Sequence, residues 1–207
     1  MSFKVGLIIG STRTPRVGPK VADWVHQVIT SAGDNDRISI ERVDLADFKL
    51  PVFDEGGIPV AMNGKYEHEH SKRWGATIGA LDAFVFVIPE YNANVAAATK
   101  NAIDYLYHEW TGKPVAIVSY GMQGGKHASA ALALSLETVL KMRVAPTRPQ
   151  LAFGGGFEGD GSKAAIQGEL GERSIKEWEE NGGKDDILKA WSELKKSLTE
   201  NGVDQAN

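Results

Sequence analysis

Cysteine is absent from this chain of 207 residues. Its absence excludes disulfides, thiolate catalysis, iron–sulfur clusters and cysteine-ligated zinc sites. The chain also has no large excess of one charge, because its net charge is only −4 at pH 7, so nucleic acid is not an expected partner. No apolar run reaches the length of a membrane span, and the first one is too short for a signal peptide. We therefore expect a cytoplasmic protein without membrane insertion.

Two segments of the chain have the same strand–turn–helix pattern, in which an apolar strand leads into a polar turn and then a helix. They are Lys4 to Val25 and Ala83 to Leu106. In an open parallel sheet such turns lie at the carboxyl ends of the strands, where ligands bind at the point at which strand order reverses. The hydrophobic content of 42% is sufficient for one sizeable core. The pattern thus predicts an α/β protein with a nucleotide site at one sheet edge.

The first of these turns combines hydroxyls, two guanidiniums and a glycine, and no carboxylate occurs from Gly6 to Ala22. Backbone N–H groups at a helix start attract an anion, and arginine recognises phosphate with a planar fork of donors. The turn therefore predicts a phosphate cup, with an ordinary polar turn as the alternative. The residues expected in the cup are Ser11, Arg13, Arg16, Val17 and Gly18.

Better-known phosphate turns require residues that are missing here. A P-loop needs Lys and Ser or Thr directly after its last glycine, but Gly18 is followed by Pro19. A dinucleotide turn needs G-x-G-x-x-G, and only strand residues separate Gly6 from Gly10. A phosphatase of low molecular weight needs a cysteine nucleophile, and a response regulator needs an acceptor aspartate at the end of a central strand. What is left is a cup that holds a phosphate without attacking it.

Three turns, taken in order, carry a resemblance to a known family. They are Gly10-Ser11-Thr12-Arg13, Pro89-Glu90-Tyr91-Asn92 and Ser119-Tyr120-Gly121-Met122-Gln123-Gly124-Gly125. Together they resemble the NADPH-dependent FMN reductase family, flavodoxin-like quinone and flavin reductases marked by a GSxR turn and a PEYN turn. The resemblance covers Lys4 to about Phe153. It departs at Val17-Gly18, because family members have a serine near the helix start.

The resemblance implies that the second and third turns hold the flavin ring. Pro89, Glu90, Tyr91 and Asn92 are expected beside the ring, with Glu90 as a carboxylate at a helix N-terminus rather than an acid–base catalyst. The third turn is expected to aim helix-start N–H groups at the carbonyl end of the ring, which favours two-electron chemistry; its alternative is a glycine turn chosen for tightness. The residues expected in this turn are Ser119, Tyr120, Gly121, Gly124 and Gly125.

The activity implied is an FMN-dependent NAD(P)H oxidoreductase that passes two electrons to a quinone, flavin or azo-type acceptor. No side chain is expected to be catalytic, because flavin N5 carries the chemistry. The family resemblance also implies a homodimer or homotetramer. Two alternatives stay open: a flavodoxin-like electron carrier or FMN-binding module without NAD(P)H turnover, and a flavin-free structural protein. Carriers of that kind usually present a strongly acidic face, which a net charge of −4 does not suggest.

Strands and helices alternate along the chain, as in a parallel sheet covered by helices on both faces. The expected fold is a flavodoxin-like three-layer sandwich with five parallel strands in the order 2-1-3-4-5. Strands are expected at Val5 to Ile9, Ile38 to Asp44, Ala83 to Ile88, Val115 to Ser119 and within Ala145 to Phe153. Helices are expected at Gly18 to Ser31, Ser71 to Leu81, Ala96 to Glu109, Ala128 to Lys141 and Lys184 to Glu200.

The remaining segments carry weaker signals. The FMN-binding domain is expected to span residues 1–155, with residues 156–207 forming a loose segment and an amphipathic helix appended to it. Glu67-His68-Glu69-His70 has side chains that bind metals, but nothing else in the sequence completes a ligand shell, so a solvated loop is expected and no metal. Trp74 and Trp110 are expected to fill core or an interface rather than bind ligand.

Overall fold

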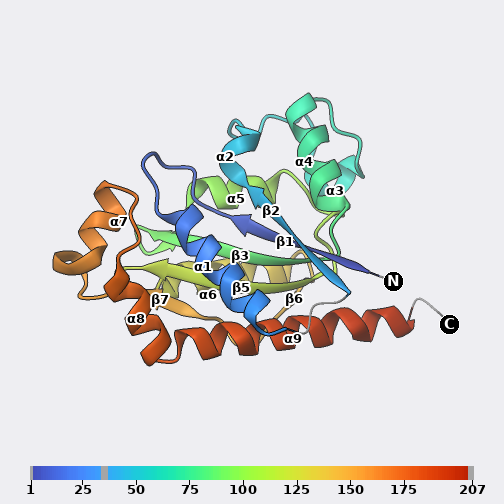
Figure 1. Cartoon of the computed structure of the whole chain (residues 1–207). Coiled ribbons are helices and arrows are strands. Elements are labelled where there is room, and N and C mark those ends of the chain that lie inside the picture. The colour runs from blue at the N-terminus through green and yellow to red at the C-terminus, as the bar shows by residue number, and fades with distance from the viewer. Residues whose placement is uncertain (1, 34–36, 205–207) are drawn as a thin grey trace.

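The computed structural model describes residues 2–33 and 37–204. Its centre is a parallel sheet in which the strands run in the order β2-β1-β3-β5-β6, with β7 also paired to β5 (Figure 1). Val5 of β1 lies between Ile40 of β2 and Ala83 of β3, which sets the register of the three strands. The strands are β1 Phe3–Ile9, β2 Ile38–Asp44, β3 Ala83–Tyr91, β5 Pro114–Gly121, β6 Arg143–Val144 and β7 Gln150–Ala152.

The fifth position of the sheet differs in detail from the expectation. Instead of one strand within Ala145 to Phe153, two short strands pair in parallel with different parts of β5. Pro146 and Pro149 lie between them, and a proline has no N–H to give to a ladder. The predicted order 2-1-3-4-5 is confirmed, with β6 and β7 sharing the place of the fifth strand.

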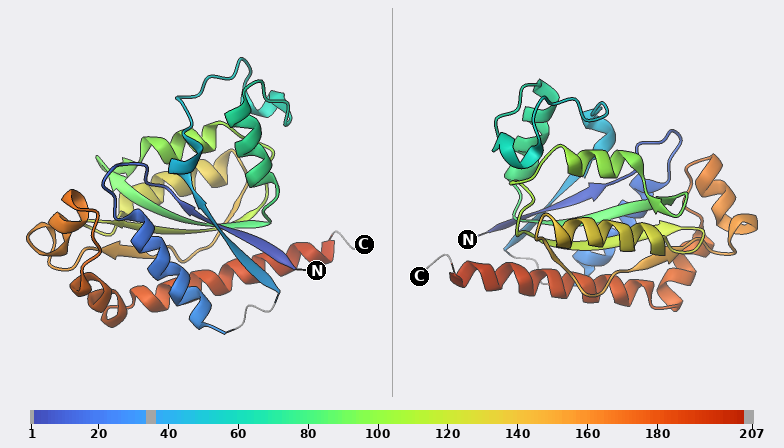
Figure 2. Two further views of the ribbon diagram at one scale, coloured as in Figure 1. Left: turned by 45° about the horizontal axis from the view of Figure 1, so that its top comes forward. Right: turned by 180° about the vertical axis from the view of Figure 1, so that it is seen from behind.

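Helices cover both faces of this sheet, as the two views of Figure 2 show. One face packs against α1 and α9, and the other against α4, α5 and α6, so each face has its own apolar core. Alternate residues of β1 divide between the cores: Leu7 and Ile9 face α1, whereas Ile8 faces the opposite side. The covering helices are α1 Gly18–Ser31, α4 Glu69–Gly79, α5 Ala97–Asp104, α6 Lys126–Thr138 and α9 Gly183–Asp204.

The tryptophans expected in the core lie there. Trp74 and Trp110 are fully buried, and their rings pack edge to face with centroids 5.9 Å apart. The indole N–H of Trp74 donates to the carbonyl of Ala102 at 2.7 Å, which ties α4 to α5. These side chains therefore stabilise the fold and are not available to a ligand.

The segment after β7 is more regular than the sequence suggests. Where a loose stretch is expected, the chain forms a π-helical turn η1, Phe157–Gly161, and the helices α7, Ser162–Ile166, and α8, Glu172–Glu180. The amphipathic helix α9 then places Ile187, Trp191 and Leu194 in the same core as α1. It covers its own domain, and the proposed boundary at residue 155 stays a prediction.

Two connections contain further short elements. Residues between β2 and α4 form α2, Leu45–Phe48, and α3, Pro59–Met62. After β3 the chain turns back on itself, and β4, Asn94–Val95, pairs antiparallel with the end of β3. Asn92 and Ala93 at this turn have φ of 50° and 55°, the left-handed region that a tight hairpin requires.

Candidate functional site

The three turns singled out in the sequence meet at the edge where β1, β3 and β5 end. Between them lies a cavity of about 280 Å³, called the edge cavity here. It is lined by Ser11, Arg13, Val17, Pro89, Glu90, Tyr91, Tyr120, Gly121, Met122, Phe153, Ala164 and Ala165. Arg16, Gly18, Asn92, Ser119, Gly124 and Gly125, also expected at the site, are not among these lining residues.

The two arginines of the first turn have different surroundings. Arg13 lines the edge cavity, and its guanidinium donates to the carbonyls of Ala164 and Ala165 in α7. No ion pair within the described part of the chain involves Arg13, so its charge is not neutralised by a carboxylate. A guanidinium with neutral partners at a cavity wall is suited to an anionic ligand.

Arg16 does not line the edge cavity and instead binds the first turn to Asp44. Its two terminal nitrogens donate to the two carboxylate oxygens of Asp44 at 2.7 and 2.8 Å, and one of them also donates to the Ser11 carbonyl at 2.6 Å. The hydrogen bonds that Arg16 donates to Asp44 raise the pKa of its guanidinium, although burial acts against this shift. Arg16 therefore connects the first turn to the end of β2, whereas the sequence places both guanidiniums in the cup.

Hydroxyl groups line the wall beside Arg13. The Ser11 and Tyr91 hydroxyl oxygens lie 3.2 Å apart and share a hydrogen bond. Burial raises the pKa of the Tyr120 phenol, so this group is a neutral donor or acceptor at any ordinary pH. A Cβ at Gly18 would lie 2.7 Å from the Tyr120 oxygen. A side chain at this position would crowd the phenol, so glycine is the residue that fits here without a shift of Tyr120.

Glu90 caps a helix, as expected, but the helix is α6 rather than the one that follows it in sequence. Its Oε2 accepts the backbone N–H groups of His127 at 2.8 Å and Ala128 at 3.1 Å. A carboxylate therefore occupies two of the donors at the start of α6. The expectation that this helix start presents its free N–H groups to the ligand needs correction, because Glu90 offsets the partial positive charge there.

The two later glycines of the third turn, Gly124 and Gly125, shape the turn and do not line the edge cavity. Gly124 and Gly125 both have left-handed φ, of 75° and 76°. A Cβ on Gly125 would lie 2.8 Å from the Cβ of Ser119, whose hydroxyl donates to the Gly124 carbonyl at 2.8 Å. This tight turn leaves Gly121 and Met122 at the cavity wall. Tightness is thus a sufficient reason for the two later glycines.

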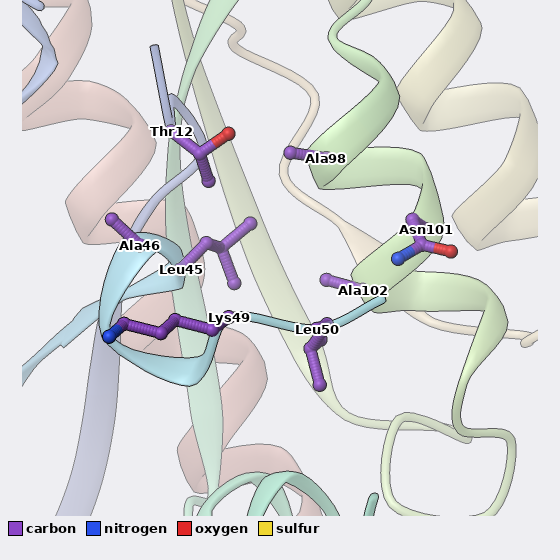
Figure 3. Close-up of a pocket in the computed structure, with 8 residues that line it drawn as sticks. All are labelled: Thr12, Leu45, Ala46, Lys49, Leu50, Ala98, Asn101 and Ala102. Carbon is purple, nitrogen blue, oxygen red and sulfur yellow. The ribbon is translucent and has the colours of Figure 1, made fainter. Parts of the chain in front are cut away.

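A second cavity, of about 310 Å³, lies on the other side of the first turn. It is lined by Thr12, Leu45, Ala46, Lys49, Leu50, Ala98, Asn101 and Ala102, and Figure 3 shows the Lys49 amino group pointing away from its centre. The Asn101 amide already donates to Pro51 O at 2.6 Å and accepts from Phe53 N at 3.0 Å. Because its polar groups do not converge, this cavity is a weaker candidate than the edge cavity.

The histidines of the Glu67 to His70 segment have a structural role. His70 Nε2 lies 2.9 Å from an Asp54 carboxylate oxygen, and His68 Nε2 lies 3.2 Å from the Asp54 carbonyl. These contacts attach the loop after β2 to the start of α4. Among the described residues no group of three or more His, Asp or Glu side chains is placed to hold a metal ion. That the protein binds no metal at this segment stays a prediction.

Comparison with known proteins places the chain in a family. The family model described as NADPH-dependent FMN reductase matches residues 3–157. The chain belongs to the NADPH-dependent FMN reductase family. The three turns that line the edge cavity all fall within the matched residues. The residues after 157, which include most of the segment between β7 and α8 and all of α9, lie outside the match.

Curated relatives of this family align over most of the chain. The NAD(P)H-dependent FMN reductase ntnL of Nectria sp is 52% identical over 197 residues, 94% of this chain and 96% of the relative. The NAD(P)H-dependent FMN reductase LOT6 of Saccharomyces cerevisiae is 42% identical over 148 residues, 69% and 77% of the two chains. A quinone reductase of Pseudomonas putida is 33% identical over 141 residues, 65% and 69% of the two chains.

Solved structures support the fold. The flavoenzyme NAD(P)H:(acceptor) oxidoreductase FerB of Paracoccus denitrificans superposes with a TM-score of 0.64 at 20% identity and covers 94% of this chain and 98% of its own. An oxidoreductase of Corynebacterium diphtheriae gives the same TM-score at 17% identity, with 96% and 98% covered. The flavodoxin-like architecture expected from the sequence is confirmed.

Residues at the cavity that the sequence did not single out come from distant segments. Phe153 follows β7, and Ala164 and Ala165 belong to α7. No local pattern marks an alanine in a glycine-rich stretch as a ligand contact. Met122 is different, because it lies inside the third turn, and its exposed fraction of 40% shows a large apolar side chain in contact with solvent. Its position in the third turn, between Gly121 and Gly124, is the sequence signal that could have identified Met122 as a cavity residue.

Proposed function

We propose that this family member is an FMN-dependent NAD(P)H oxidoreductase whose flavin occupies the edge cavity. The observation that carries the proposal is the arrangement of the cavity wall. Arg13, a cation without a carboxylate partner, stands at one part of the wall, and Pro89, Tyr91 and Tyr120 supply apolar and aromatic surface at another. An anionic phosphate and a flat aromatic ring are the ligand groups that these walls suit.

The residues fit FMN in charge as well as in shape. Glu90 is the acidic residue among those that line the cavity, and its carboxylate is engaged by the start of α6, so it does not face a phosphate as a free charge. Arg13 and Ser11 would hold the phosphate, and the backbone from Pro89 to Tyr91 and from Tyr120 to Met122 would hold the ring. The deep burial of Tyr120 keeps that part of the wall dry.

When bound, FMN supplies a hydride acceptor at N5 and returns two electrons to a second substrate. The chain's own residues bind and orient; none of those lining the cavity is required as acid, base or nucleophile. We propose NADPH or NADH as the donor, and quinones, flavins or azo compounds as acceptors, since relatives named FMN reductase and quinone reductase align over most of the chain. Donor and acceptor would occupy the same open side in turn, which predicts ping-pong kinetics.

The visible spectrum of the purified protein tests this function. We expect the two absorption bands of oxidised flavin, bleaching by NADPH or NADH without oxygen, and recovery of colour when a quinone is added. A protein that binds FMN but is not bleached by either coenzyme would be an electron carrier or a binding module. A colourless preparation that ignores added FMN would contradict the proposal altogether.

We also propose a homodimer, or a tetramer built from dimers. A groove of about 320 Å³ lies between α3, α5 and α6. Val60 and Val139 line it with exposed fractions of 46% and 58%, and such apolar surface favours burial by a partner. Sedimentation should give at least a dimer, whereas Val139→Glu should shift the species towards monomer. A monomeric wild type would contradict this assembly.

The place of the protein in the cell is part of the same proposal. No helix in the described part of the chain is long and apolar enough to cross a membrane. We propose a cytoplasmic location because NAD(P)H, the proposed reductant, is available in the cytoplasm. Fractionation of the source cells, followed by detection of the protein in the cytosolic fraction, tests it.

A further inference from the structure

The segment from Gly154 to Gly171, called the roof here, joins β7 to α8 and contains η1 and α7. Figure 1 shows α7 beyond the ends to which the strand arrows point. Ala164 and Ala165 of α7 line the edge cavity. The residues matched by the family model end at 157, so most of the roof lies outside the family pattern. The roof is therefore a part of the site for which the family match gives no role.

Arg13 connects the roof to the first turn. Its Nη1 donates to the carbonyl of Ala165, and its Nη2 lies 3.5 Å from the carbonyl of Ala164. A guanidinium has five N–H donors in a fixed plane, so these two acceptors leave donors free on both nitrogens and on Nε. Two fixed carbonyls thus set the plane of the fork while other donors stay available for a phosphate.

Two further contacts hold the residues that follow α7 against the first turn and the start of α1. The Lys20 ammonium pairs with the Glu169 carboxylate. Gly168, with φ of 69°, lies so close to Arg16 that a Cβ there would be 2.8 Å from the Arg16 backbone nitrogen. This approach of one backbone to another is possible only without a side chain. Gly168 is thus the position at which a single methyl group would separate roof and turn.

The far end of the roof is anchored in the protein interior. The Asp160 carboxylate is buried and accepts the backbone N–H of Ser174 at 2.7 Å and its hydroxyl at 2.9 Å. The Ser174 hydroxyl oxygen in turn accepts the N–H of Gly154 at 2.9 Å. A buried carboxylate is stable only when donors satisfy it, so these hydrogen bonds fix η1 and the start of the roof against Ser174 of α8.

From these contacts we propose that the roof is a positioning element for the cofactor phosphate, and that it acts through Arg13. The proposal rests on the proposed function. Anchored at Asp160 and packed on the turn at Gly168, the roof presents the Ala164 and Ala165 carbonyls that orient the guanidinium. Without the roof, Arg13 would lose these partners and the side chain would sample many rotamers. Ordering it again would then reduce the binding energy.

The test is Gly168→Ala, compared by titration of the apoprotein with FMN and with riboflavin, which lacks the phosphate. We expect FMN binding to weaken on the order of fivefold, the loss of about one neutral hydrogen bond, while riboflavin binding stays nearly unchanged. Gly112→Ala is the matched control. Gly112 has a similar φ of 72°, but a Cβ there would meet nothing within 4 Å. The control introduces the same backbone strain without moving the roof.

A double-mutant cycle separates positioning from general support. In an Arg13→Ala background, Gly168→Ala should no longer discriminate between FMN and riboflavin, because the side chain through which the roof acts is gone. If Gly168→Ala does not fold, Ser174→Ala loosens the opposite end of the roof and should show the same FMN-specific loss. Melting of the ligand-free variants shows whether each one is folded.

Equal weakening of FMN and riboflavin by Gly168→Ala would overturn the proposal, because the roof would then be a general cover. Unchanged binding of both flavins in a folded variant would also overturn it. Failure of the proposed function looks different, since the wild-type protein itself would then bind neither flavin.

Discussion

Replacing Arg13 by alanine is expected to weaken FMN binding on the order of 10- to 100-fold and riboflavin binding far less. A charge-assisted hydrogen bond to a phosphate contributes roughly 1.5 to 3 kcal/mol, and riboflavin has no phosphate to lose. Arg13 is the cationic residue among those lining the edge cavity, which makes the loss large. Quenching of flavin fluorescence by the apoprotein gives both dissociation constants.

A matched arginine provides the control for that experiment. Arg42 pairs with Asp23 on the surface, with 44% of its side chain exposed, and it does not line the cavity. Arg42→Ala removes the same charge and should change neither dissociation constant by more than about twofold, because an exposed ion pair contributes little. Equal losses of FMN and riboflavin in Arg13→Ala would remove Arg13 from the phosphate site.

The elements that the sequence predicts best are those whose local signals agree with their packing. Helix α1 and strand β2 have the predicted bounds, Gly18–Ser31 and Ile38–Asp44. In α1 the glycine and proline at its start coincide with an apolar stripe that faces the sheet. Helix α5 ends at Asp104, earlier than expected, and the apolar residues that extend the helical pattern, Tyr105, Leu106 and Trp110, are buried outside the helix.

The roof shows where local signals are insufficient. Its glycines predict a loose segment, yet several of its close approaches are made to residues far away in sequence. Gly154 contacts Ser174, Gly161 lies against Met122, and Gly168 lies against Arg16. A glycine chosen for flexibility and a glycine chosen for close packing are identical in sequence, so only the fold distinguishes them.

The sequence likewise predicts some parts of the site and not others. The turns of the site could be recognised because each is a short, contiguous motif at a strand end. The sequence could not predict that Arg13 lines the cavity while Arg16 pairs with a carboxylate, because both arginines lie in one turn and have the same side chain. The difference depends on Asp44, at the end of β2, whose carboxylate accepts hydrogen bonds from both terminal nitrogens of Arg16.

This difference between the two arginines predicts a contrasting result for the second one. Arg16→Ala should lower the free energy of unfolding by about 2 kcal/mol, less than the loss of a fully buried partner, because the two side chains keep 19% and 12% exposure. Asp44 would retain the N–H of Ala46 as a donor but lose its cation. FMN and riboflavin binding should then fall by similar factors, since the loosened turn serves both ligands.

Denaturation of the apoprotein measures the stability change, and a second substitution identifies its cause. The double variant Arg16→Ala/Asp44→Asn replaces the carboxylate by a neutral amide whose oxygen would still accept the Ala46 N–H, as asparagine does at helix starts. If the cost arises from an unpaired carboxylate, this double variant should recover part of the lost stability. If Arg16→Ala instead weakens FMN while sparing riboflavin, Arg16 contacts the phosphate as well, and the two arginines form one cup rather than a ligand group and its support.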